Sequence, residues 1–373
     1  MLTALGTWAT RVCGTSPFTD VYGAARTLLA TGTLVTLVCN PASTLFAPGT
    51  AGAPQPHCGG AASLSVYCLA PGPESARWIS VAVLLVVMSG FAPRWTAIPH
   101  WWVSYSLQVS ASVIDGGDQI SAVATLLLVP VALCDGRRSH WARDPAAPAP
   151  GERLRHAWIA GWIALGAVRL QAAVVYFHAG TAKFGVAEWA DGTAMYYWLS
   201  DPHMGAPAWQ RTLIDPLMQH SLPVALLTWS VPLGEIALAA ALVMPARHWR
   251  PFLVAALLFH AAIAAVMGLV SFSLAMAALD LLFLRRADHA LPLHLGVPAR
   301  LRSRGRPAAD TSDHGPPRPG PQKGTPHDDD LPAQDTFPAP GPQPAGERLL
   351  GRLTHLRGQL GRRLAHRPYL RRS

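Results

Sequence analysis

Residues 222–244 read LPVALLTWSVPLGEIALAAALVM, and residues 251–268 read PFLVAALLFHAAIAAVMG. Each block has about the 20 apolar residues that an α-helix needs to cross the hydrocarbon core of a bilayer. Lipid offers no hydrogen-bond partner to a peptide group, so such a segment must satisfy its own backbone, as a helix does. The two blocks therefore predict a helical integral membrane protein.

Similar apolar blocks recur through the first 286 residues of the chain. Strong candidates for membrane spans are 22–40, 76–92, 118–134, 157–183, 222–244 and 251–268, and two weaker ones are 99–115 and 270–285. We therefore predict an all-α, polytopic membrane bundle of about eight spans. The segment from Trp101 to Ile114 is short and carries Ser and Gln. It is either a span inside the bundle or a re-entrant hairpin.

The composition of the chain agrees with this class. Of its 373 residues, 50% are hydrophobic and only 14% are charged, whereas a soluble domain carries roughly 25% charged residues. A net charge of +9 would also suit nucleic-acid binding. The arginines, however, cluster at the ends of apolar blocks and in the tail, as membrane topology requires. We therefore expect a lipid bilayer as the surroundings and no nucleic-acid partner.

The placement of arginine predicts the orientation of the spans, because short cytoplasmic loops collect Lys and Arg. With about eight spans and the N-terminus inside, the outer loops hold Arg211, with Arg77 and Lys183 at span edges. The inner connections hold Arg11, Arg94, Arg137, Arg138, Arg143, Arg153, Arg155, Arg247, Arg250, Arg285 and Arg286. This asymmetry predicts a multi-pass plasma membrane protein with both termini in the cytoplasm.

Three regions divide the chain. Residues 1–286 form the predicted transmembrane domain. Residues 287–346 are rich in Pro and Gly, which predicts a disordered linker. In residues 347–373, leucines recur at helical spacing among arginines. This tail is either a basic amphipathic helix lying on the anionic inner leaflet or a solvated charged segment.

Two cysteines lie in the long predicted outer loop, 41–75. Cys58 and Cys68 face an oxidising exterior in this layout, where such a pair closes a small loop as a disulfide. We expect a structural disulfide; a redox-active pair is the alternative.

Ionisable side chains inside predicted spans are costly and mark candidate functional residues. In the span 157–183, Arg169, Tyr176 and Lys183 recur every seven residues and so lie on one helical face. A polar stripe from mid-bilayer to the outer surface suggests a lined cavity. The alternative is that Arg169 is a buried structural ion paired with Glu235 of the next span.

Other polar residues of the spans give weaker signals. His260 is expected to hydrogen-bond across helices, and Asp280 needs a partner that the sequence does not identify. A metal site drawn from His178, Glu235 and His260 lacks diagnostic spacing, so no metal is predicted.

The run Asp115-Gly116-Gly117-Asp118 predicts a tight turn between the third and fourth spans, because glycine supplies backbone freedom. Asp118 also lies at the start of a helix, where capping explains an aspartate. The alternative is that Asp115 and Asp118, two carboxylates at an outer helix end, meet a basic peptide or a metal.

One stretch resembles a known family. Residues 176–184 read YFHAGTAKF and are followed by Trp189, Gly192 and Tyr196. This pattern resembles the signature of horizontally transferred transmembrane domain proteins, which include vitamin K-dependent γ-carboxylase. A closer resemblance, over about residues 20–286, is to the bacterial sporulation-delaying protein B family. It includes Gly23 to Arg26, Ser89-Gly90 with Pro93-Arg94, Ile114 to Gln119, and Asp135 with Arg137 before His140-Trp141.

The closer resemblance implies a membrane protein that assists the maturation and export of a secreted antimicrobial peptide. Its partners would be a peptide precursor and a companion maturation protein. The carboxylase resemblance implies an alternative, a membrane enzyme in which Lys183, with His178 or Tyr176, acts as a base on a quinone or lipid-like substrate. A peptide transporter or an immunity protein is a third possibility. The cofactors, and whether any reaction is catalysed, stay open.

Overall fold

The computed structural model describes residues 15–49, 52–113, 115–142 and 152–285. The predicted linker 287–346 and basic tail 347–373 lie outside the described residues. Within those residues the secondary structure is helical, apart from the isolated bridges Pro48–Pro54 and Phe91–Ser139.

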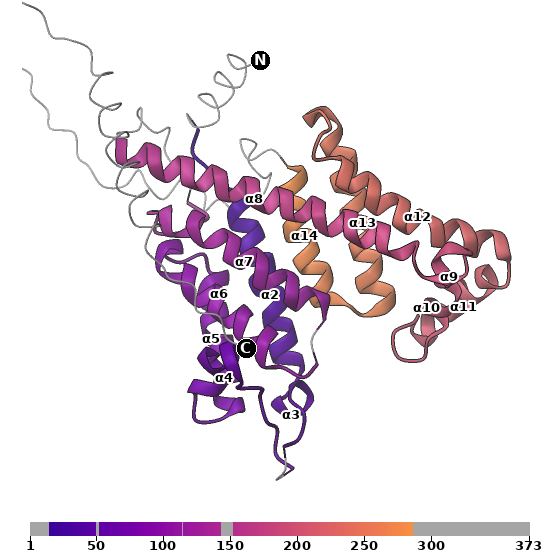
Figure 1. Ribbon diagram of the computed structural model, residues 1–373, viewed down its shortest axis with the longest axis horizontal. Coiled ribbons are helices and arrows are strands. Elements are labelled where there is room, and N and C mark those ends of the chain that lie inside the picture. Colours follow the sequence, from indigo (N-terminus) through magenta and orange to yellow (C-terminus); the bar gives the residue numbers. More distant parts are fainter. Residues whose placement is uncertain (1–14, 50–51, 114, 143–151, 286–373) are drawn as a thin grey trace, which may run out of the picture. The chain divides into compact units, whose positions relative to one another are not determined.

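Helices of 15 to 32 residues occupy all the apolar blocks that the sequence singles out (Figure 1). They are α2 (Asp20–Cys39), α5 (Pro73–Met88), α6 (Pro93–Ser110), α7 (Gly116–Cys134), α8 (Glu152–Lys183), α12 (Ser221–Ala240), α13 (Trp249–Met267) and α14 (Val270–Leu284). Short helices lie in the connections: α3 (Ala42–Leu45), η1 (Gly60–Leu64), α4 (Val66–Leu69), α9 (Ala187–Ala190), α10 (Ala194–Ser200), α11 (Ala208–Met218) and η2 (Ala246–His248).

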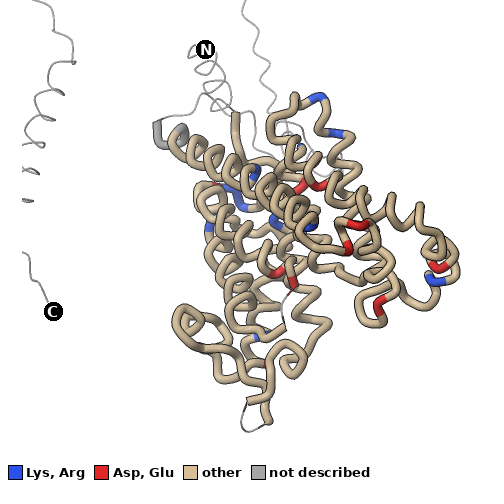
Figure 2. Tube along the Cα trace, turned by 45° about the vertical axis from the view of Figure 1, so that its right-hand side comes forward, with Lys and Arg blue, Asp and Glu red and all other residues tan. Residues whose placement is uncertain are grey.

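Five helices of the described chain are long and apolar enough to cross a membrane. They are α2, α7, α8 from His156 onward, α12, and α13 together with η2. Of the remaining expected spans, α14 is apolar but has 15 residues, α5 has 16 residues, and α6 has 18. The hydropathy of α6 is low because it carries polar side chains, among them His100 and Ser104, that are buried against neighbouring helices. Charged residues are sparse along the described helices (Figure 2).

The helix α2 packs against α14, α5 and α7, and these helices with α6 are called the α2 bundle below. Its core joins apolar residues of α2, α7 and α14, such as Leu29, Leu128 and Leu279. A second core, which includes Leu37 and Leu107, joins α2 to α5 and α6. The α2 bundle is therefore held by apolar side chains along the length of α2.

The helix α8 lies against α7 and α14 and extends along α12, while α13 packs against α14. The helices α12 and α13 are called the α12–α13 pair below. The buried share of the apolar window is 61% in α2 but only 28% in α12 and 17% in α13. The α12–α13 pair therefore offers most of its apolar surface to lipid or to a partner.

The helix ends of the α2 bundle meet at two polar regions. At the first, called the Asp115 end, the Arg77 guanidinium at the start of α5 donates to the carbonyl oxygen of Leu37 at 2.7 Å. The Ser271 hydroxyl of α14 donates to the Asp115 carboxylate, just before α7, at 2.6 Å. The end of α2, the start of α5, the α6–α7 connection and the α13–α14 turn thus meet here.

At the second region, called the His140 end, the α5–α6 turn pairs with the segment that follows α7. The backbone N–H of His140 donates to the Gly90 carbonyl oxygen at 2.9 Å, and that of Ala92 donates to the Arg138 carbonyl oxygen at 2.8 Å. Consequently α5, α6 and α7 each run from one polar end of the α2 bundle to the other.

Candidate functional site

Lys183, the last residue of α8, forms an ion pair with Glu235 in the C-terminal half of α12. Its Nζ lies 2.7 Å and 2.9 Å from the two carboxylate oxygens of Glu235. The two helices approach closely here because Gly180 has no side chain: a Cβ there would stand 2.9 Å from the Pro232 carbonyl oxygen. The Lys183 ammonium also lies 5.4 Å from the ring centroid of Trp189. The ion pair therefore joins α8 to α12.

This ion pair is only partly shielded from its surroundings. The side chain of Glu235 is 10% exposed and that of Lys183 is 22% exposed. Removing one partner of such a pair leaves the other charge buried without compensation. The Lys183 ammonium is thus fixed by Glu235, while part of the Lys183 side chain remains exposed.

A second polar cluster joins α8, α13 and α14. The Tyr176 hydroxyl donates to Asp280 Oδ1 at 2.6 Å and lies 2.9 Å from His260 Nε2. All three side chains are buried. Because a tyrosine hydroxyl has one proton and gives it to Asp280, it accepts a hydrogen bond from His260 Nε2. Asp280 Oδ2 and His260 Nδ1 have no hydrogen-bond partner among the described residues.

The structure divides the expected polar stripe of α8 among separate contacts. Arg169 lies over the indole of Trp249, with its Cζ 4.2 Å from the ring centroid. Glu235 therefore pairs with Lys183 and not with Arg169. The physical reason is distance, since the 14 residues between Arg169 and Lys183 correspond to about 21 Å along the helix. Antiparallel packing of α12 brings Glu235 beside Gly180, close to the Lys183 end.

The three expected catalytic residues are not brought together. Tyr176 precedes Lys183 by seven residues, about 10 Å along α8, and its hydroxyl is held by Asp280. His178 is exposed, about 200° around the helix from Tyr176. Lys183 thus has Glu235, and neither expected helper, as its ionisable neighbour in the described chain.

Asp115 and Asp118 lie at the start of α7. Asp115 is the N-cap residue, and its Oδ1 accepts from the Asp118 backbone N–H at 2.9 Å. The Asp118 side chain accepts in return from the Asp115 backbone N–H at 3.4 Å, which completes a capping box. The N-cap is therefore Asp115 and not Asp118, the aspartate expected from the sequence; Asp118 is the third residue of the helix.

Cys58 and Cys68 are joined by a disulfide in the connection between α3 and α5, with Cα atoms 5.8 Å apart. The same connection is attached to α6 by two side chains. The Trp102 indole N–H donates to the Leu64 carbonyl oxygen at 2.8 Å, and the Tyr105 hydroxyl donates to that of Ala61 at 3.0 Å.

The sequence did not reveal a polar cluster around Arg26, at the His140 end. Arg26 is 1% exposed, and its guanidinium donates to the Thr96 hydroxyl at 3.0 Å and lies 3.5 Å from His140 Nδ1. Gly90 has a φ of +80° and leaves room for the imidazole, since a Cβ there would stand 2.8 Å from His140 Cδ2. Burial, with the nearby charges of Arg26 and Arg137, lowers the pKa of His140 to about 3.

These residues belong to short motifs that are far apart in the sequence. Gly23 to Arg26 lies on α2, Ser89-Gly90 forms the α5–α6 turn, and His140-Trp141 follows α7. One sequence feature could have revealed this cluster: all three motifs fall at the predicted inner ends of spans, where they can meet.

Comparison with known proteins identifies relatives but no template for this fold. No family model matches the chain, and no solved structure matches it. The chain is 38% identical over 280 residues to the uncharacterized protein YitO of Bacillus subtilis (strain 168), a match that covers 74% of this chain and 88% of YitO. It is 33% identical over 283 residues to the sporulation-delaying protein SdpB of the same strain, covering 75% of this chain and 85% of SdpB. The chain therefore belongs to the same protein family as YitO and the sporulation-delaying protein SdpB.

Proposed function

We propose that this protein is a multi-pass plasma membrane component that assists the maturation or export of a secreted, toxin-like antimicrobial peptide. The observation that carries the proposal is the relation to SdpB, which covers 75% of this chain at 33% identity. The proposed partners are a peptide precursor and a companion maturation protein. The candidate spanning helices support a membrane location for this function.

The helix ends support a layout of eight spans with both termini in the cytoplasm. Because α5, α6 and α7 run between the two polar ends of the α2 bundle, each is placed to cross the bilayer. At 1.5 Å per residue, α5 and α6 are about 24 Å and about 27 Å long, close to the roughly 30 Å of a hydrocarbon core. The polar side chains of α6 are buried in the bundle, which favours a span over a re-entrant hairpin.

The charges at the polar ends support the same orientation. Arg94, Arg137 and Arg138 lie at the His140 end, and under the positive-inside rule this supports a cytoplasmic location for that end. The Asp115 end, the disulfide loop and the α9–α11 connection then face the exterior. A secreted peptide would meet the protein on that side.

The environment of Lys183 supports a recognition role over a role as a catalytic base. A base needs a neutral amine, whereas Lys183 Nζ is bound by both carboxylate oxygens of Glu235. An enzyme of the carboxylase type would require Lys183 first to transfer its proton to Glu235. The ammonium also donates to the Ala179 carbonyl oxygen at 3.2 Å. A protonated lysine held in this way is better suited to electrostatic attraction of a peptide than to removal of a proton.

The test is deletion of the gene in its host, with mass spectrometry of secreted peptides and of cell extracts. We expect the mature peptide to disappear from the medium while the precursor persists in the cells. A plasmid-borne wild-type gene should restore the mature peptide. Unchanged secretion in the deletion strain, with altered quinones or lipids in the extracts, would contradict the proposal and favour the enzyme.

A further inference from the structure

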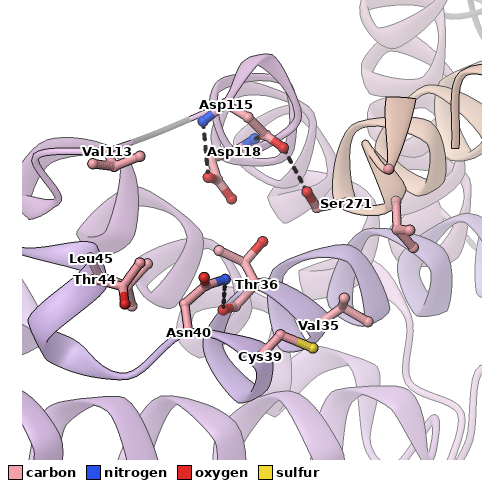
Figure 3. Close-up of a pocket in the computed structure, with 12 residues that line it drawn as sticks. Val35, Thr36, Cys39, Asn40, Thr44, Leu45, Val113, Asp115, Asp118 and Ser271 are labelled. Carbon is pink, nitrogen blue, oxygen red and sulfur yellow. Dashed lines mark hydrogen bonds between the residues drawn. The ribbon is translucent and has the colours of Figure 1, made fainter. Parts of the chain in front are cut away.

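A pocket of about 310 Å³ opens at the Asp115 end of the α2 bundle (Figure 3). Four parts of the chain form it: the end of α2, the short helix α3, the α6–α7 connection with the start of α7, and the α13–α14 turn. Its volume is at the low end of the range of roughly 300–1,000 Å³ for small-ligand sites. The pocket therefore accommodates one extended side chain and not a folded domain.

Oxygen atoms line one side of the pocket. Figure 3 shows the Asp118 carboxylate pointing into the space above Thr36 and Asn40 of α2, with Asp115 and Ser271 beside it. Thr36 brings a hydroxyl group and Asn40 an amide oxygen. Several oxygens around one space can accept hydrogen bonds from an ammonium group, which presents three N–H donors.

The Asp118 carboxylate has no cation beside it. Asp118 is only 4% exposed. In the described chain its carboxylate accepts one hydrogen bond, a long contact of 3.4 Å from the Asp115 backbone N–H. None of the ion pairs of the described residues includes Asp118 or Asp115. A buried carboxylate is costly unless a positive group compensates it, and here the nearest acidic neighbour adds to the negative charge.

The remaining walls are apolar. Val35 of α2 and Leu45 of α3 line the pocket, as do Val113 of the α6–α7 connection and Val270 at the start of α14. Apolar walls beside carboxylates match an aliphatic stem with a terminal ammonium group. A lysine side chain has this composition, with four methylene groups and one compact positive charge.

We propose that this pocket binds the ammonium group of a lysine side chain from the secreted peptide. The identity of the ligand as a peptide rests on the proposed function, whereas the chemistry of the pocket does not. Asp118 is the compensating anion, Asp115 adds negative potential while it caps α7, and Thr36 and Asn40 complete the oxygen set. The apolar walls hold the methylene stem.

Cys39 provides a built-in reporter, because it lines the pocket and its thiol is free and exposed. The full-length protein is placed in phosphatidylcholine nanodiscs and treated with a membrane-impermeant maleimide, and the modification of each cysteine is followed by mass spectrometry. The probe is N-acetyl-pentalysine amide. The control probe is the same peptide with acetylated lysine side chains. We expect pentalysine to slow the modification of Cys39 several-fold, the control probe to have no effect, and Cys134, outside the pocket, to react equally with either.

Variants test the assignment of Asp118. Asp118→Asn keeps the shape of the side chain and removes its charge, so protection of Cys39 by pentalysine should disappear. Asp115→Asn retains a good N-cap and should reduce protection only in part. Thr36→Val removes one oxygen, keeps the volume, and should also reduce protection in part, which provides an answer if Asp118→Asn does not fold. Full protection in Asp118→Asn or Thr36→Val, or equal protection by the acetylated probe, would overturn the proposal.

A phosphatidylethanolamine headgroup also carries an ammonium group, so a second set of nanodiscs contains that lipid and no peptide. Protection of Cys39 in those discs as strong as that by pentalysine would assign the pocket to lipid and overturn the peptide proposal. The gene deletion separates this inference from the proposed function. If deletion abolishes the mature peptide but pentalysine does not protect Cys39, the proposed function is supported and the proposed lysine-binding role of the pocket is contradicted.

Discussion

The α2 bundle and the α12–α13 pair use polar residues in different ways. In the α2 bundle, α2 is 61% buried, and polar residues such as Arg26 and His140 close the ends of a continuous apolar core. In the α12–α13 pair, the apolar window of α13 is only 17% buried, and polar contacts join Glu235 of α12 to Lys183 of α8 and His260 of α13 to Tyr176 of α8. The comparison suggests that the bundle is a scaffold and that the pair is a surface for lipid or a partner.

The largest effect on stability is expected at the His140 end of the α2 bundle. Arg26→Met keeps the apolar stem but leaves the Thr96 and His140 contacts of the guanidinium unmade, which should destabilise the protein by about 3 kcal/mol. The matched control is Arg94→Met, because Arg94 is exposed and its hydrogen bond within the described part of the chain goes to the Leu133 carbonyl oxygen. Thermal unfolding in detergent, followed by size-exclusion chromatography, measures both. If the two variants melt at the same temperature, the Arg26 cluster does not stabilise the α2 bundle as proposed.

A comparable effect is expected for the connection between α3 and α5. Replacement of Cys58 and Cys68 by serine should lower stability by about 2–4 kcal/mol if the disulfide is structural. Thiol labelling of the intact protein without reductant should leave both cysteines unmodified. Ready labelling of both would show that they are free thiols.

A smaller effect is expected where the α12–α13 pair meets α8. Tyr176→Phe removes the hydroxyl that bridges Asp280 and His260, which should cost about 1–3 kcal/mol because buried polar groups lose their partner. The control is Tyr196→Phe, since Tyr196 is 46% exposed. If Tyr176→Phe melts at the same temperature as Tyr196→Phe, the cluster does not attach the pair.

The sequence predicted the helices well because a long apolar block in lipid must satisfy its own backbone hydrogen bonds, as a helix does. It predicted the partners of the polar residues less well. Those partners depend on helix packing, as at Gly180, where the close approach of α12 assigns Glu235 to Lys183 instead of Arg169. The partner of Asp280 needed the same information, since Tyr176 lies 104 positions away in the sequence.

The smallest effect on stability is expected when both members of the α8–α12 ion pair are replaced. Lys183→Met alone leaves the Glu235 carboxylate without compensation and should reduce stability. The double variant Lys183→Met with Glu235→Met removes both charges, and replacing a partly buried ion pair with apolar residues is often neutral, within about 1 kcal/mol. A lower melting temperature for the double variant than for Lys183→Met alone would contradict this prediction.

We propose that the α2 bundle maintains the fold and that the Lys183–Glu235 pair acts on the secreted peptide. The most direct measurement is the amount of mature peptide in the medium per amount of folded protein in the membrane. For the double variant Lys183→Met with Glu235→Met, we predict wild-type amounts of folded protein and loss of the mature peptide. The variant Lys183→Arg keeps the positive charge and should still produce the mature peptide. Wild-type peptide output per folded protein in the double variant would contradict the claim.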